Sequence, residues 1–195
     1  KLRMEKMYQT RTKIRSISRR NALKSELKKQ KGVLLLDEGV QFPEQNDWKN
    51  QPFLSLPGGE QVKTWNNLGM CLEFFSHEKL ERSSTLVAVG GGATLDLAAF
   101  AASLYRRGMK LILIPSTLLG MVDASIREKT AVDREGKILI KNFAGTFYFA
   151  DEVWICPFLM ETLPKRERIS GSAELWKMLW ISGSSHENEV IFQHI

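Results

Sequence analysis

The sequence predicts an α/β fold in which a mostly parallel β-sheet is covered by helices on both faces. From Gly32 onward, short apolar runs rich in Val, Ile and Leu alternate with segments whose apolar residues recur at helical spacing. Strands that are buried on both faces read as unbroken apolar runs, which is typical of parallel sheets with helices on either side. The composition, 43% hydrophobic and 26% charged over 195 residues, is that of an ordinary globular protein.

Five apolar runs are predicted to be strands. Each is short and is bounded by residues that favour turns. No element is assigned to the polar, lysine-bearing stretch that follows the fourth run and ends at about Asn142. The runs are 32–40, 52–57, 84–92, 110–117 and 152–156 (GVLLLDEGV, PFLSLP, STLVAVGGG, KLILIPST and EVWIC).

Two helices are predicted between these strands. Apolar residues recur at helical spacing within 64–80, and 94–108 is a helix closed by a glycine. After Pro164 the pattern is wholly helical, so we expect a domain boundary at that point. The expected domains are a nucleotide-binding α/β domain over 1–164 and the beginning of a helical domain over 165–195.

The formal net charge of +6 is unevenly placed, because Lys and Arg dominate residues 1–31. Such a segment can bind nucleic acid, but no nucleic-acid motif or aromatic interleaving accompanies it, which favours a solvated helix face. No apolar run approaches the roughly 20 residues that span a bilayer, and no signal core follows the basic start. Cys71 and Cys156 lie in apolar surroundings and fit reduced core thiols better than a disulfide. We therefore expect a soluble cytoplasmic protein that binds neither nucleic acid nor membrane.

One predicted strand runs directly into Gly90, Gly91 and Gly92, and a helix follows. Without side chains, the backbone can approach a pyrophosphate closely, and the helix N-terminus offers it free N–H groups and partial positive charge. The run differs from the G-x-G-x-x-G fingerprint, so a tight turn without a ligand is an equal alternative. Asp96 favours the nucleotide, because an acid early in the helix can bind a ribose hydroxyl, although it can also cap the helix.

Four segments of the sequence resemble motifs of the 3-dehydroquinate synthase family and follow one another in the same order as in that family. The block 87–133 is similar, nearly residue for residue, to the central block of that family, and 56–64 (LPGGEQVKT) resembles its second nucleotide-contacting segment. Its substrate-site motifs are matched by 141–148 (KNFAGTFY) and 163–177 (LPKRERISGSAELWK). The resemblance runs from about 33 to 182 and implies a Rossmann-like NAD-binding domain followed by a helical metal-binding domain, in a homodimer.

The resemblance also implies roles for single residues. The substrate would be an acidic sugar phosphate, whose carboxylate and phosphate suit a cluster of lysines with an arginine. The implied NAD contacts are Asp37, Glu60, Lys63, Gly91, Gly92, Asp96, Ser116, Thr117 and Leu119. The implied substrate and catalytic residues are Lys129, Lys177, Asn142, Asp123, Lys141, Glu167 and Arg107.

The sequence positions of several of these residues agree with the chemistry. Asp37 ends a predicted strand, where a carboxylate can accept both hydrogen bonds of a ribose. Ser116 and Thr117 follow another strand, which places their hydroxyls at the carboxyl edge of the sheet, although such a pair can also cap a helix. Considered singly, each lysine would be a surface residue, so the lysine assignments depend on the resemblance.

The implied metal site is incomplete in this chain. Glu174 resembles the carboxylate ligand of the family's catalytic divalent metal, usually zinc, and shares a helix face with Lys177. Without the resemblance, the same spacing would be an exposed ion pair. A catalytic zinc site needs three protein ligands, and the family takes the other two from histidines far downstream. His186 and His194 follow Glu174 too closely to be those histidines.

The function implied by the resemblance is the NAD-dependent conversion of 3-deoxy-arabino-heptulosonate 7-phosphate to 3-dehydroquinate with loss of phosphate, a shikimate-pathway step. This chain would be a fragment of that enzyme and inactive alone. A related cyclase of the valiolone-synthase type is an alternative, because Arg127 and Glu128 replace a glycine pair common in the family before Lys129. A non-catalytic nucleotide-binding remnant is a further alternative. A metal-dependent polyol dehydrogenase would share the glycine turn but not 141–148 or 163–177.

Overall fold

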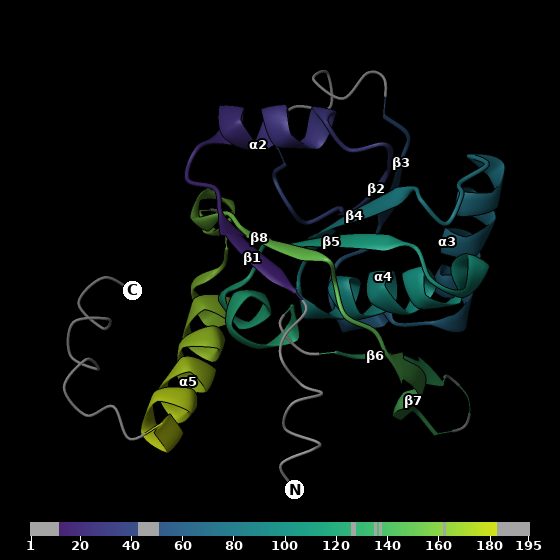
Figure 1. Ribbon diagram of the computed structural model, residues 1–195. Coiled ribbons are helices and arrows are strands. Elements are labelled where there is room, and N and C mark those ends of the chain that lie inside the picture. The colour runs from purple at the N-terminus through teal and green to yellow at the C-terminus, as the bar shows by residue number, and fades with distance from the viewer. Residues whose placement is uncertain are drawn as a thin grey trace, which may run out of the picture.

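The computed structural model describes residues 12–42, 51–125, 128–134, 136, 138–161 and 163–182 (Figure 1). Six strands form one sheet in which every pair of neighbouring strands is parallel. The predicted α/β fold with a parallel sheet is therefore confirmed. In spatial order the strands are β1 (Lys13–Ser16), β8 (Glu152–Ile155), β5 (Lys110–Pro115), β4 (Thr85–Gly90), β2 (Gly32–Asp37) and β3 (Phe53–Leu56).

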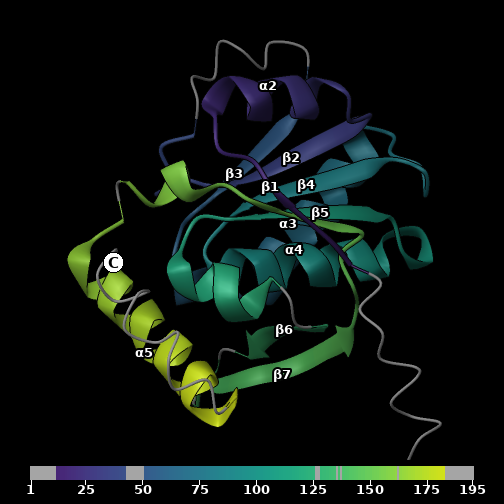
Figure 2. The same ribbon diagram turned by 60° about the vertical axis from the view of Figure 1, so that its left-hand side comes forward.

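Helices cover both faces of the sheet (Figures 1 and 2). One face is covered by α2 (Arg20–Lys28), and the opposite face by α3 (Trp65–His77) and α4 (Gly92–Leu104). Successive side chains of a strand point to opposite faces. Leu34 of β2 therefore joins the core beneath α2, whereas Leu35 joins the core shared with α3 and α4.

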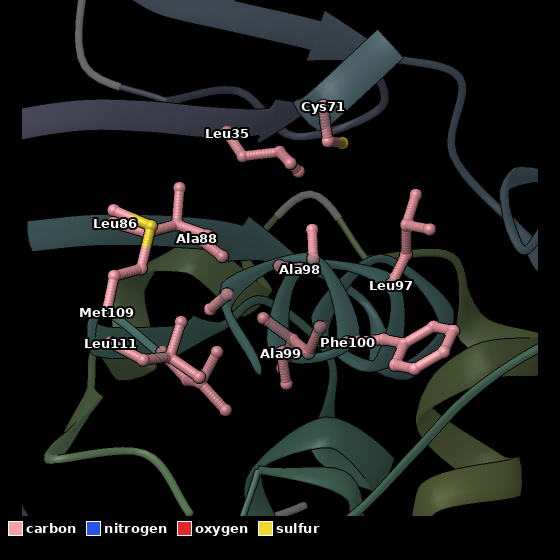
Figure 3. Packing of buried hydrophobic residues seen from close by; sticks show 14 of the residues in the cluster. Leu35, Cys71, Leu86, Ala88, Leu97, Ala98, Ala99, Phe100, Met109 and Leu111 are labelled. Atoms are coloured by element: carbon pink, nitrogen blue, oxygen red, sulfur yellow. The ribbon is translucent and has the colours of Figure 1, made fainter. Parts of the chain in front are cut away.

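The second of these cores fixes the helix that follows the glycine turn. Leu86 and Ala88 of β4 pack in one cluster with Ala98 of α4, together with Cys71 of α3 (Figure 3). Small alanine side chains let α4 lie close to the sheet, and its residues from Leu97 to Ala102 are all buried. A helix packed in this way holds its N-terminus at a fixed position against the ends of the strands.

Both cysteines are buried free thiols, as predicted. Burial raises the pKa of Cys71 and of Cys156 to about 12. Their thiolate forms are therefore scarce at neutral pH, and the two residues act as core side chains.

The five predicted strands are confirmed, with ends that differ by up to three residues from those expected. Residues 38–40, at the end of the first run, form the turn that was expected to close that strand. The predicted helix over 94–108 begins at Gly92 and ends at Leu104. Its last residues form a separate turn, in which Arg106 and Arg107 have φ angles of 49° and 64°.

Two parts of the fold were missed at the sequence level. The basic N-terminal region contains the expected solvated helix, α2, but also the edge strand β1; its residues 1–11 lie outside the described part. The polar stretch that was left without an element contains an antiparallel hairpin of β6 (Lys129–Arg134) and β7 (Ile140–Phe147). Both corrections have one cause, which is that neither segment carries a long apolar run.

The helical pattern after Pro164 is confirmed by α5 (Lys165–Ser182). This helix packs against the segment after β5, and a Cβ atom at Gly171 would lie 2.7 Å from Leu118 Cβ and 2.8 Å from Leu119 N. In Figure 1, α5 and the β6–β7 hairpin both extend below the sheet, on the side where α4 lies. No helix in the described ranges has the length and apolar character needed to cross a membrane.

Candidate functional site

The predicted nucleotide-binding residues meet at the carboxyl edge of the sheet. Because β2, β4 and β5 are neighbours, Asp37, the glycine turn and Ser116 come together there. Ser116 N donates to Gly90 O at 2.9 Å, and Gly91 N lies 3.5 Å from Asp37 Oδ2. In open α/β sheets, ligands bind in the crevice beyond this edge.

The glycine turn combines one tightly packed position with one open position. A Cβ at Gly90 would lie 2.7 Å from Thr94 Cβ and 2.9 Å from Asp37 Cβ, whereas a Cβ at Gly91 would meet only Thr117 Cγ2, at 3.4 Å. The backbone of Gly91 is extended, and no side chain caps the N-terminus of α4. The turn therefore has room for a ligand beside Gly91, and the helix N-terminus can offer it N–H groups.

Asp37 is buried and braces this turn. Its carboxylate accepts hydrogen bonds from Gly39 N at 2.9 Å and from the Thr94 hydroxyl at 3.1 Å. A Cβ at Gly58 would lie 2.4 Å from Asp37 Oδ1, so the backbone at Gly58 approaches the carboxylate closely. Asp37 thus stands where a ribose contact was expected, and it also joins β2 to the first turn of α4.

Ser116 and Thr117 lie at the expected edge, and the helix-capping alternative holds for Thr117. Its hydroxyl accepts a hydrogen bond from Gly120 N at 3.0 Å. Ser116 is buried, whereas Leu119 is partly exposed beside this cap. A π-helical turn, Gly120–Ala124, follows and carries Asp123. Single π-helical turns are frequent at functional sites.

Lys63 is the most buried charged residue of the predicted site, with only 4% of its surface exposed. It follows a short 3-10 turn, Glu60–Val62, and its ammonium donates to Asp96 Oδ2 at 3.0 Å and to Asn142 Oδ1 at 2.6 Å. The structure therefore joins two expected NAD contacts, Lys63 and Asp96, to the expected substrate residue Asn142. An ammonium buried at this depth requires such partners, since an unpaired charge would be costly.

The β6–β7 hairpin contributes one wall of a cavity of about 360 Å³. Asp96 of α4, together with Lys129 and Asn142 of the hairpin, lines it. A Cβ at Gly145 would lie 1.9 Å from Thr130 O, so the two strands approach each other closely here. The cavity adjoins residues expected to contact NAD and residues expected to contact substrate, and it is large enough for a small organic anion.

Other predicted substrate residues lie outside this cavity. Lys141 is exposed, and its ammonium lies 3.5 Å from Glu60 Oε1. Glu167 lies exposed in the first turn of α5. Arg107 follows the C-terminal end of α4, at the edge of the sheet opposite to the glycine turn, and the structure does not bring it together with the other site residues.

Glu174 and Lys177 form an ion pair on α5, with Lys177 Nζ 2.8 Å from Glu174 Oε1. This geometry agrees with the ion pair that their spacing alone indicates. Within the described ranges, no three His, Cys, Asp or Glu side chains come close enough to hold a metal ion, and His186 and His194 lie outside those ranges. The described residues therefore supply one implied ligand, Glu174, and do not form a site for a divalent metal.

Two further site residues, Thr94 and Asp133, were not expected from the sequence. The structure places the Thr94 hydroxyl on Asp37, and Asp133 Oδ1 accepts a hydrogen bond from Asn142 N at 2.7 Å. Both are buried polar residues with apolar residues beside them, Leu95 next to Thr94 and Val132 next to Asp133, which is a weak sequence signal.

The comparison with protein families agrees with the geometry. The family model described as 3-dehydroquinate synthase N-terminal matches residues 53–170. A 3-dehydroquinate synthase of Pyrobaculum aerophilum is 43% identical over 145 residues, which are 74% of this chain and 40% of that protein. The chain spans between 32% and 40% of the length of the curated relatives that it matches.

Solved structures of sugar-phosphate cyclases share the fold. A 2-epi-5-epi-valiolone synthase from Streptomyces hygroscopicus, solved with NAD+ and Zn2+ bound, matches with a TM-score of 0.73 and 24% identity over 89% of this chain and 54% of that one. A 2-deoxy-scyllo-inosose synthase complexed with carbaglucose-6-phosphate, NAD+ and Co2+ matches with a TM-score of 0.71 and 27% identity over 84% of this chain and 47% of that one. The expected Rossmann-like architecture is confirmed.

Proposed function

Because the chain belongs to the 3-dehydroquinate synthase family, we propose that it is the NAD-binding part of an enzyme that converts 3-deoxy-arabino-heptulosonate 7-phosphate to 3-dehydroquinate. The observation that carries this proposal is the open glycine turn at the carboxyl edge of the sheet, next to Lys63 and Asp96. The family match begins at β3, includes this turn and the hairpin, and ends within α5. It therefore includes residues on both the nucleotide side and the substrate side of the cavity.

The residues of the turn fit a bound dinucleotide. The N-terminus of α4 would receive the pyrophosphate beside Gly91 and Gly92, and carboxylates at Asp37 and Asp96 would accept hydrogen bonds from ribose hydroxyls. Bound NAD would accept a hydride from the substrate, and this oxidation acidifies the proton next to the oxidised carbon. The reduced nucleotide would later return the hydride. The task of this part of the chain is to bind and orient the nucleotide.

The hairpin would bind the anionic substrate. Lys129 and Asn142 line the cavity, and Lys141 lies on the adjacent exposed surface. A heptulosonate phosphate carries a carboxylate and a phosphate, and both are stabilised by ammonium groups. Lys177 of α5 would serve the same purpose if substrate draws it from its ion pair with Glu174.

Nucleotide binding is tested by Gly91→Val. A Cβ at Gly91 meets only Thr117 Cγ2, so the variant should fold, while its side chain occupies the space that the pyrophosphate needs. We expect calorimetry to show NAD affinity lowered at least about 10-fold, which is about 1.4 kcal/mol. Gly69→Val is the matched control, because a Cβ at Gly69 meets no atom within 4 Å. Equal NAD affinity in Gly91→Val and the wild type would contradict the proposal.

Substrate chemistry is tested in the natural full-length product, by phosphate release from the heptulosonate phosphate with NAD and zinc supplied. Lys129→Ala should lower turnover by about 2–4 kcal/mol of transition-state stabilisation while NAD affinity stays unchanged. Lys110→Ala is the control, since Lys110 is exposed at the opposite edge of the sheet. Normal kinetics in Lys129→Ala would show that this lysine is only a surface charge.

A related cyclase is the second candidate, because the inosose synthase solved with a sugar-phosphate analogue matches with a TM-score of 0.71. The two candidates differ in the substrate carboxylate. Phosphate release from the heptulosonate phosphate alone supports the first candidate. Release from glucose 6-phosphate, which has no carboxylate, supports the second.

A further inference from the structure

A closed ring of hydrogen bonds links the nucleotide side of the cavity to the hairpin. Asp133 N donates to Lys63 O at 2.7 Å, and Asn142 N donates to Asp133 Oδ1 at 2.7 Å. Lys63 Nζ donates to Asn142 Oδ1 at 2.6 Å and so closes the ring. The segment at Lys63 and the two strands of the hairpin, which lie far along the chain from it, therefore fix one another through backbone and side-chain atoms.

The hairpin backbone is irregular at both of its positions in this ring. The register of β6 and β7 shifts between Val132 and Arg134, so Asp133 lies opposite residues 141–143 at a bulge or irregularity of the hairpin. Asn142, on the facing strand, has a φ of 51°, in the left-handed region that residues other than glycine rarely adopt. Bulges beside functional sites redirect a side chain, and strained residues persist only where their surroundings hold them. Here the Asp133 carboxylate accepts a hydrogen bond from the N–H of Asn142, the residue with the left-handed backbone.

The ring also reaches the first turns of α4, because Lys63 Nζ contacts Asp96 Oδ2 at 3.0 Å. Asp96 and Asn142 line the cavity, whereas Asp133 is 5% exposed and is not among the cavity-lining residues. Asp133 can therefore affect a ligand only through its neighbours. We infer that Asp133 is a positioning residue that fixes Lys63 and Asn142 and so aligns the nucleotide-binding edge with the substrate hairpin. This inference rests on the proposed function.

The chemistry of this position requires a hydrogen-bond acceptor. Asp133→Asn keeps an oxygen that can accept from Asn142 N. Asp133→Leu removes the acceptor of this part-buried hydrogen bond and so opens the ring at Asn142. Asp133→Ser is smaller, and its hydroxyl is one bond too short to reach. If Asp133 acts through the ring, Asp133→Asn should keep Lys63 and Asn142 in place, whereas Asp133→Leu and Asp133→Ser should not. A general loss of stability would not separate the three variants in this way.

The control for a merely structural role is Tyr148→Phe. The Tyr148 hydroxyl donates to Met109 O at 2.7 Å, so this variant removes a half-buried hydrogen bond at the base of the same hairpin. Tyr148 does not line the cavity and is not part of the ring. A fall in melting temperature in Tyr148→Phe therefore measures the cost of loosening the hairpin alone.

The first measurement follows Lys63 without any ligand. Competitive acetylation of the 195-residue chain with acetic anhydride, read by mass spectrometry, gives the reactivity of Lys63 relative to the exposed Lys110. We expect Asp133→Leu and Asp133→Ser to raise this ratio about 10-fold, because local opening frees the buried amine. Asp133→Asn and Tyr148→Phe should leave it unchanged. An unchanged ratio in both Leu and Ser variants would overturn the inference, and Asp133→Ser decides the result if Asp133→Leu does not fold.

The second measurement is NAD affinity by calorimetry in the same five proteins. Misplacement of Lys63 and Asp96 should weaken binding roughly 5- to 20-fold in the Leu and Ser variants and leave the Asn variant and Tyr148→Phe like the wild type. Wild-type affinity in the Leu or Ser variant, or an equal loss in Tyr148→Phe, would overturn the positioning role. A wild-type chain that fails to bind NAD would overturn the proposed function and the inference that rests on it, whatever the acetylation ratio shows.

Discussion

At the scale of single residues, Gly90 and Gly91 are neighbours with opposite steric surroundings. A Cβ at Gly90 would lie within 3 Å of both Thr94 and Asp37, two residues that brace the turn. We expect Gly90→Ala to lower the free energy of unfolding by about 1–3 kcal/mol, because neither neighbour can move without breaking their hydrogen bond. Gly91→Ala should cost less than about 0.5 kcal/mol, since its Cβ meets only one methyl group. Urea unfolding of the two variants measures the difference, and equal losses would mean that the turn relaxes freely.

Single residues also show how far the sequence could predict the site. The edge positions of Asp37, Ser116 and the glycine turn follow from strand order alone, because neighbouring parallel strands end together. The partners of Lys63 could not be predicted in this way. Its contact with Asn142 joins residues that are 79 positions apart. The contact also depends on the irregular register of the hairpin and on the left-handed backbone of Asn142, and the sequence predicts neither feature.

At the scale of elements, the edge strand β1 pairs with β8 through its backbone, and its further links to neighbouring elements are charges and not an apolar run. Arg15 Nη2 lies 3.0 Å from Glu26 Oε2 of α2, and Arg15 Nη1 lies 3.3 Å from Glu152 Oε2 of β8. Hydrogen bonds from Lys29 and then Arg15 lower the pKa of Glu26. Burial would raise the pKa of Glu152, but hydrogen bonds from Trp154 and Arg15 outweigh it, and the pKa falls. The strand β1 could not be predicted from apolar runs, because it has none and because its pairing partner, β8, lies far along the chain.

This network predicts a pH dependence. A carboxyl group whose folded pKa is lowered contributes stability above its unfolded pKa, near 4.5 for Glu26, and that stability is lost as the pH falls through the folded pKa. Arg15→Met should lower the free energy of unfolding by about 0.5–1 kcal/mol at pH 7, because these ion pairs are partly exposed. The difference from the wild type should be smaller at pH 3 than at pH 7, because it is lost as the pH falls from about 4.5 through the lowered folded pKa. Urea unfolding at the two pH values checks this, and a difference that persists undiminished in acid would assign the effect to packing of Arg15 on Trp154.

At the scale of the whole molecule, the parallel α/β sheet follows from the apolar runs, because burial on both faces leaves a continuous apolar pattern. The β6–β7 hairpin does not follow from them. Phe143 and Phe147 of β7 are exposed, and a two-stranded hairpin is barely stable without further support. Its position depends on contacts with α4 and on the ring at Lys63. Tertiary contacts therefore determine the part of the candidate site that local sequence patterns left undefined.

The whole molecule also determines what this chain does with zinc. Glu174 is the one carboxylate that the family resemblance assigns to the metal, and it is paired with Lys177 at 2.8 Å. Zinc would have to displace that ammonium and bind without two further donors, because no cluster of three donor side chains exists in the described ranges. A single carboxylate cannot preorganise a tetrahedral site. We expect dialysis against zinc followed by elemental analysis to find no stoichiometric metal, with Glu174→Gln equal to the wild type. One tightly bound zinc per chain that is lost in Glu174→Gln would contradict this prediction and would place the metal site within these 195 residues.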